Sequence, residues 1–214
     1  MLVKPILFVP CALLLSPLLS HAFIPSLQRP YLKAQLRTAC DKKDEATIFR
    51  LAEELRAINP TTDIIKDFNK LDGEWKLEFT TAPAQEVPDE SATNIKTYQT
   101  IDAAEGIIYN VIDRGLPEKG LKIAVGAEPT RKDRVALDFR TIEALSDTFP
   151  KKVVIRFPPR NLVKAVFKAG KFFKGEPFDE IEFKEIGHFD VLFLDDDLRI
   201  QRNSEGNLFI NSRI

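Results

Sequence analysis

The fold is decided by the stretch FLDDDLRIQRNSEGNLFI, residues Phe193 to Ile210. Its three consecutive carboxylates, Asp195 to Asp197, belong either to a metal site or to a corner between two strands. The DDxxD pattern of Mg²⁺-dependent prenyl transfer needs an acid where Arg199 stands, and hard cations need several converging oxygen ligands. Apolar and polar residues alternate after this corner, and a polar turn follows at Gly206, as in a hairpin. We therefore predict a solvated acidic corner that binds no metal and tolerates substitution of Asp195 and Asp196 at little cost in stability.

The same alternation recurs from Leu71 to the end of the chain. In GEWKLEFTT, which begins at Gly73, the side chains of Trp75, Leu77 and Phe79 are expected on one face of a strand. Similar segments lie at 94–101, 106–112, 121–127, 134–142, 152–157, 180–186 and 189–194. Short turns separate them, so about eight to ten antiparallel strands form a sandwich or a closed barrel. Because closure removes exposed sheet edges, we predict a mainly β fold with an antiparallel barrel over residues 71–214.

Two helices are expected before the barrel, in an N-terminal extension over residues 31–62. Leu32, Leu36 and Ala39 have the spacing of one helical face, and a second apolar stripe runs from Ile48 to Ile58. Pro60 ends the second helix, because proline cannot continue a helix and disfavours helical geometry in the residue before it.

One segment inside the barrel sequence has helical spacing instead. RNLVKAVFKAGKFFKGEPF, residues 160–178, predicts an inserted amphipathic helix. Its basic face comprises Arg160, Lys164, Lys168, Lys171 and Lys174, and Phe172 and Phe173 lie on the opposite, apolar face. Such a helix either packs on the barrel as a lid, with solvated lysines, or lies in a membrane interface.

The first residues carry targeting signals. Residues 1–22 combine Lys4, an apolar run interrupted by prolines and a small-x-small end at Ala22, which is typical of a cleaved signal peptide and not of a membrane anchor. Residues 23–30 begin an acid-free, basic segment headed by Phe23, which is typical of a transit peptide and resembles the bipartite presequences of algae with secondary plastids. After cleavage Cys40 would be the only cysteine, so no internal disulfide forms, and we favour a plastid over ordinary secretion.

Composition and motifs argue against several function classes. The net charge is −1 and becomes −2 once residues 1–22 leave with Lys4, which is no footprint for nucleic acid. His188 would be the only histidine of the mature chain, and no G-x-S-x-G signature accompanies it. We expect no catalytic residues and no cofactor, although an exported hydrolase that uses His188 and scattered carboxylates remains an alternative.

Two resemblances to known proteins make the prediction of the fold more specific. Gly73-Glu74-Trp75 resembles the G-x-W that begins lipocalin barrels, where the tryptophan closes one end and a late arginine packs across it. Arg199 or Arg202 could pack on Trp75 in this way through a cation–π contact. The chain as a whole, from about Tyr31 to Phe209, resembles the plastid lipid-associated proteins, also called fibrillins. The residues that carry this resemblance include Gly73, Trp75, Asp195, Asp197, Arg199, Arg202 and Gly206.

The family resemblance implies a lipocalin-like barrel in a plastid, associated with plastoglobules or thylakoids. It implies a non-catalytic protein that binds a hydrophobic small molecule such as an isoprenoid, a quinone or a carotenoid. A structural coat that adsorbs to an anionic plastid membrane or a lipid particle, without a specific ligand, is the alternative. Small inward residues would leave a cavity in the barrel, whereas bulky ones would fill it.

Overall fold

The structure is a computed structural model that describes residues 25–83, 95–116, 119–145, 153–158 and 187–214, together with 164–166, 168, 177 and 179. Its helices are α1 (Pro25–Asp41), α2 (Glu45–Ala57) and the 3₁₀ helix η1 (Phe68–Leu71). Its strands are β1 (Gly73–Thr80), β2 (Lys96–Asp102), β3 (Ile107–Leu116), β4 (Lys119–Pro129), β5 (Arg134–Leu145), β6 (Val153–Arg156), β7 (His188–Leu194), β8 (Leu198–Asn203) and β9 (Leu208–Arg213).

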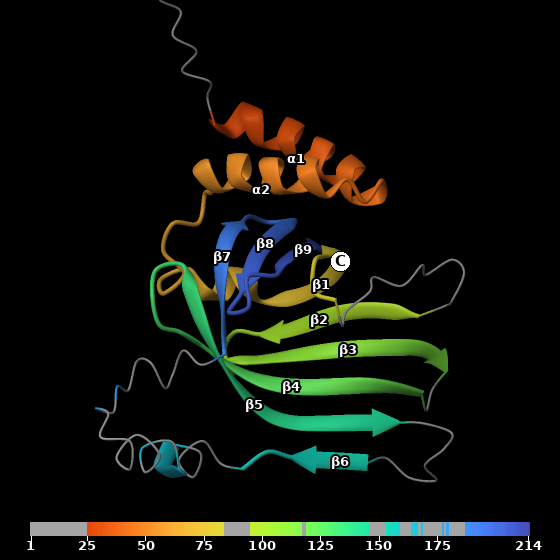
Figure 1. Ribbon diagram of the computed structural model, residues 1–214, viewed down its shortest axis with the longest axis vertical. Coiled ribbons are helices and arrows are strands. Elements are labelled where there is room, and N and C mark those ends of the chain that lie inside the picture. The colour runs from red at the N-terminus through yellow and green to blue at the C-terminus, as the bar shows by residue number, and fades with distance from the viewer. Residues whose placement is uncertain are drawn as a thin grey trace, which may run out of the picture.

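The strands close into an antiparallel barrel, as the sequence predicts. Strands β1 to β5 form a meander, β7 pairs with the start of β5, and β8 and β9 follow. The barrel closes because β9 pairs with β1. Strand β6 lies outside this ring and pairs with the far end of β5 (Figure 1). The mainly β, lipocalin-like fold with helices at the N-terminus is therefore confirmed.

Part of the predicted inserted helix lies outside the described residues. Residues 164–166 and 168 are helical. Arg160, Lys171, Phe172, Phe173 and Lys174 fall outside the described residues, as does the strand expected at 180–186.

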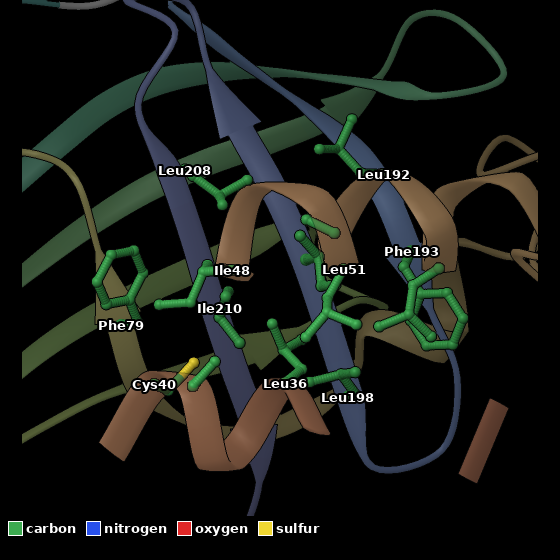
Figure 2. Close-up of a cluster of buried hydrophobic side chains, with 14 of the residues drawn as sticks. Leu36, Cys40, Ile48, Leu51, Phe79, Leu192, Phe193, Leu198, Leu208 and Ile210 are labelled. Atoms are coloured by element: carbon green, nitrogen blue, oxygen red, sulfur yellow. The ribbon is translucent and has the colours of Figure 1, made fainter. Parts of the chain in front are cut away.

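The two helices cover one side of the barrel. Helix α1 packs on α2, and both lie over β7, β8 and β9 (Figure 1). Figure 2 shows Leu36, Ile48 and Leu51 from the helices facing Leu198 and Ile210 from the strands. Helix α1 begins at Pro25, six residues before the expected extension, so the first turns come from the segment assigned to the transit peptide.

A bulge in β1 changes one expectation from the sequence. The register shifts between Leu77 and Phe79, so Phe79 joins the cluster under the helices, whereas Trp75 belongs to the cluster inside the barrel. The expectation that Trp75 and Phe79 share a face is therefore wrong. The extra residue of a bulge turns the following side chains to the other face of the strand, and simple alternation does not reveal it.

The acidic corner between β7 and β8 is not merely solvated, which corrects the sequence interpretation. Lys33 of α1 bonds to Asp195 at 2.8 Å and also to Asp197, and Arg37 bonds to Asp197 at 2.7 Å. Asp195 Oδ1 accepts hydrogen bonds from the backbone N–H of Asp197 at 3.2 Å and of Leu198 at 2.9 Å. The corner thus shapes its own turn and anchors α1 on the barrel.

The charge of this corner depends on its partners. Burial opposes ionisation of Asp197, but hydrogen bonds from Lys33 and Arg37 outweigh burial and lower the pKa of that carboxyl. A carboxyl with a lowered pKa stabilises the fold above its unfolded pKa of about 4, and this contribution is lost as the pH falls below that value. The ion pairs of Asp197 that anchor α1 therefore stabilise the fold at neutral pH and stop doing so in acid.

We predict that Asp195→Ala lowers the free energy of unfolding by about 1–3 kcal/mol, because a charged pair and two turn hydrogen bonds are lost together. Asp196→Ala is the matched control, since the neighbouring Asp196 is exposed and its change should stay within about 0.5 kcal/mol. Urea denaturation followed by the fluorescence of Trp75, the only tryptophan, measures both. Equal stability of the two variants would contradict the anchoring role.

Candidate binding site in the barrel interior

The strand registers define which side chains face the barrel interior. Trp75 lies opposite Gln99 of β2 and Arg213 of β9, and Gln99 lies opposite Asn110 of β3. Residues paired in register face the same side of a sheet. Because Trp75 packs in one cluster with residues of β2, β3, β4, β5 and β7, this side is the interior.

Two guanidinium groups lie over the ring of Trp75 near the closed end of the barrel. The guanidinium carbon of Arg199 is 5.0 Å from the ring centroid, and that of Arg213 is 4.2 Å away. The indole Nε1–H donates to the carbonyl of Leu71 at 2.8 Å, which ties η1 to the barrel. Arg202, the other predicted partner of Trp75, points outward and bonds to Glu53 of α2 at 2.9 Å. Sequence reasoning missed Arg213, although its place opposite Trp75 follows once β9 pairs with β1.

Arg213 also closes the end of the barrel. Its guanidinium donates to three backbone carbonyls, those of Asp72, of Lys70 at 2.7 Å and of Asp196 at 2.6 Å. Gly73 makes room for it, because a Cβ at this position would lie 2.7 Å from Arg213 Nη1. Gly73 also has φ +110°, a backbone conformation that residues with a side chain rarely adopt. Both facts explain why the G-x-W motif has a glycine at position 73.

A polar cluster lies beside Trp75 in the interior. Gln99 Nε2 donates to Asn110 Oδ1 at 2.5 Å, and Arg199 Nη2 donates to Gln99 Oε1. Gln201 and Asn211 join from β8 and β9, and Asn211 lies opposite Arg199. Arg199, Gln201 and Asn211 are 0 %, 6 % and 1 % exposed.

Several atoms of this cluster have no partner among the described residues. They are the donors Arg199 Nε, Arg199 Nη1 and Asn211 Nδ2, and the acceptor Gln201 Oε1. Burial, and then the nearby charge of Arg213, lower the pKa of Arg199 to about 9. Buried polar groups are normally satisfied, and each unsatisfied one is costly. The cluster is therefore a candidate site for a polar group that the described chain does not supply.

An apolar wall continues from this cluster across β3, β4 and β5. Ile123 and Ile142 are in register with Asn110, and Ile112 lies two residues farther along β3 on the same inward face; all three isoleucines are only half-buried. Farther along, Phe139 of β5 contacts Phe157 just after β6, with ring centroids 5.7 Å apart. These two rings are 52 % and 38 % exposed. One face of the sheet thus leads from buried polar atoms to exposed aromatic rings.

Other residues considered from the sequence lie elsewhere. Burial, with help from the carboxylates of Glu78 and Asp41, raises the pKa of Cys40 to about 12, so its thiol is a weak nucleophile. His188 is half-buried at the start of β7. Among the described residues, no group of three or more His, Cys, Asp or Glu side chains is placed to hold a metal ion. No helix in the described ranges has both the length and the apolarity to cross a bilayer.

A closed antiparallel barrel with a tryptophan and arginines at its closed end defines a lipocalin-like protein. The family model PAP_fibrillin matches residues 26–212, and the chain belongs to this family of plastid lipid-associated proteins. The family associates the chain with plastids and is generally non-catalytic. No curated protein and no solved structure matches the chain.

We predict that Gly73→Ala destabilises the protein more than Gly206→Ala. Both glycines have positive φ, which costs about 1–2 kcal/mol for alanine, but a Cβ at Gly206 meets no atom within 4 Å. At Gly73 the Cβ would also displace Arg213 from Trp75 and add about 1 kcal/mol. Urea denaturation measures the stabilities, and a shift of Trp75 emission in Gly73→Ala alone reports the displaced arginine. Equal losses without such a shift would contradict this role of Gly73.

Proposed function

We propose that this protein is a non-catalytic plastid protein that binds a hydrophobic small molecule, such as an isoprenoid, a quinone or a carotenoid, inside its barrel. One observation carries the proposal: the inward apolar residues Ile112, Ile123 and Ile142 are half-buried instead of packed. Eight-stranded barrels are wide enough to be filled by their own side chains or to hold one small ligand. Partly exposed aliphatic side chains on the inner face favour a ligand.

The shape of the inner face supports the same proposal. A ligand needs a route, and the exposed rings of Phe139 and Phe157 provide an apolar surface where the wall ends. Ligand sites combine a mostly apolar lining with a few placed polar groups that orient the ligand. The cluster around Arg199 supplies such polar groups at the other end. Binding and positioning are supported by these contacts, and no catalytic step is needed.

A second proposal concerns association with thylakoids, plastoglobules or another anionic lipid surface. In the segment 160–178, Ala165 and Val166 of the predicted apolar face are exposed, Val166 by 67 %. Val154 and Ile155 of β6 are also exposed, by 43 % and 54 %. Exposed apolar side chains beside lysines favour adsorption to a lipid interface over a packed lid.

We also propose import into the plastid through the bipartite presequence, with residues 1–22 removed first. The support is the signal-like segment followed by the acid-free segment headed by Phe23. A fusion of residues 1–40 to a fluorescent reporter should enter the plastid of an algal host. Reporter found only in the medium would refute this proposal.

We predict that the mature protein co-purifies with one stoichiometric hydrophobic molecule, identified by mass spectrometry of a lipid extract. Ile123→Trp should abolish it, because the added ring fills the interior. Lys122→Trp, at the adjacent outward and exposed position, is the matched control and should retain the ligand.

The stability of Ile123→Trp separates the alternatives. In a filled barrel the added ring would cost about 1–3 kcal/mol of overpacking, whereas an open interior accommodates it. A destabilised Ile123→Trp together with a mixed polar lipid extract from the wild type would favour the coat function without a specific ligand.

We predict that replacing Lys164, Lys168 and Lys171 by Gln releases the protein from anionic vesicles in a flotation assay. Each basic residue near an anionic surface contributes about 1 kcal/mol, so adhesion should also fall with added salt. Replacing Lys42, Lys43 and Lys66 by Gln removes the same charge from the region of the N-terminal helices and should leave flotation unchanged. Equal flotation of the two triple variants would refute membrane adsorption through this segment.

A further inference from the structure

Among the described residues, the positive charge of Arg199 in the barrel interior has no counterion. Arg199 is fully buried, and within the described ranges its guanidinium donates a hydrogen bond only to the neutral amide of Gln99. The charged group that acts on it is the cationic Arg213, which repels its charge. A buried charge is normally paired, because leaving it unpaired costs several kcal/mol.

Arg213, in contrast, has hydrogen-bond partners for its guanidinium. Its three N–H directions are used by the carbonyls of Lys70, Asp72 and Asp196, and the side chain reaches the surface. In the part of the chain that the structure describes, Arg199 instead retains unused Nε and Nη1 donors, and Asn211 Nδ2 adds a third from the paired position on β9. The unmet groups are therefore mainly donors around a fixed positive charge.

Resting on the proposed lipid-binding function, we propose that the barrel selects an acid-headed, single-chain amphiphile whose carboxylate lies against Arg199 and Asn211. A carboxylate accepts hydrogen bonds only, through two oxygens, and so matches donors that surround a cation. Its negative charge supplies the missing counterion, which a neutral carbonyl or a water molecule cannot do.

The surrounding surface sets the direction of the chain. From the Arg199 layer the inner face continues through Ile123 and Ile142 toward the exposed rings of Phe139 and Phe157. An amphiphile would therefore enter head first and leave the end of its chain at these rings. Gln201 Oε1 is the one acceptor without a partner among the described atoms of this cluster, and it would receive a hydrogen bond from a hydroxyl or a water beside the carboxylate.

The test compares three probes of the same chain length: dodecanoic acid, dodecan-1-ol and methyl dodecanoate, each below its aggregation concentration. Binding is followed by calorimetry and by the emission of Trp75, which stacks on Arg199. We expect the wild type to bind the acid about 10- to 100-fold more tightly than either neutral probe, as charged hydrogen bonds allow.

Arg199→Met keeps the volume of the side chain and removes the charge. It should bind all three probes with similar affinity, and it should unfold at a higher urea concentration because the unpaired charge is gone. Arg202→Met is the matched control on the outer face of the same strand and should keep the preference for the acid. Asn211→Leu should weaken acid binding about 3- to 10-fold.

The outcomes separate this inference from the lipid-binding function. Equal affinity of the wild type for the acid and both neutral probes overturns the headgroup inference and leaves lipid binding intact. A preference for the acid that survives in Arg199→Met also overturns it. No binding of any probe overturns it too, and the co-purification experiment then decides whether the barrel binds lipid at all.

Discussion

The outer faces of β8 and β9 are apolar and buried under α1 and α2, and the rest of the structure depends on this contact. Leu198, Ile200, Leu208 and Ile210 all belong to the cluster beneath the helices (Figure 2). The same strands turn Arg199, Gln201 and Asn211 toward the interior. Since the hydrophobic stabilisation of these strands comes from outside the barrel, their inner face is free to be polar. A barrel stabilised only from within would have no such freedom.

The closed end of the barrel is held by a chain of contacts around Trp75. The indole N–H donates to the carbonyl of Leu71 in η1, and Arg213 donates to the neighbouring carbonyls of Lys70 and Asp72. Arg199 of β8 lies over the indole ring. Asn59 and Thr61 tie the preceding connector to the backbone of Leu194. The indole bond to Leu71 is local, but the contacts of Arg213 with Lys70 and Asp72 span about 140 residues, so this end is complete only when β9 has paired with β1. Closure of the barrel and closure of its end are therefore one event.

Alternation along the chain predicted the strands because period-two patterns depend only on local sequence. It failed at β1, where the bulge after Leu77 turns Phe79 toward the helices. It also failed at the acidic corner, because the partners Lys33 and Arg37 lie about 160 residues away along the chain. Trp75 and Arg199 were named from a motif, whereas Arg213, Gln99 and Asn211 have no signature of their own. They become a site only through register, which the sequence does not display.

The buried charge of Arg199 indicates a function in binding, because its contribution to the stability of the fold does not explain it. An apolar residue of similar volume would satisfy the interior without desolvating a guanidinium, and such replacements are often neutral or stabilising. The cation–π contact with Trp75 contributes about 0.5–2 kcal/mol, but Arg213 already makes one on the same ring at a shorter distance. The contact of Arg199 with Trp75 is therefore partly redundant, but burying the charge of Arg199 still costs free energy. The unused donors beside Asn211 are the part of this arrangement that a bound acid would complete.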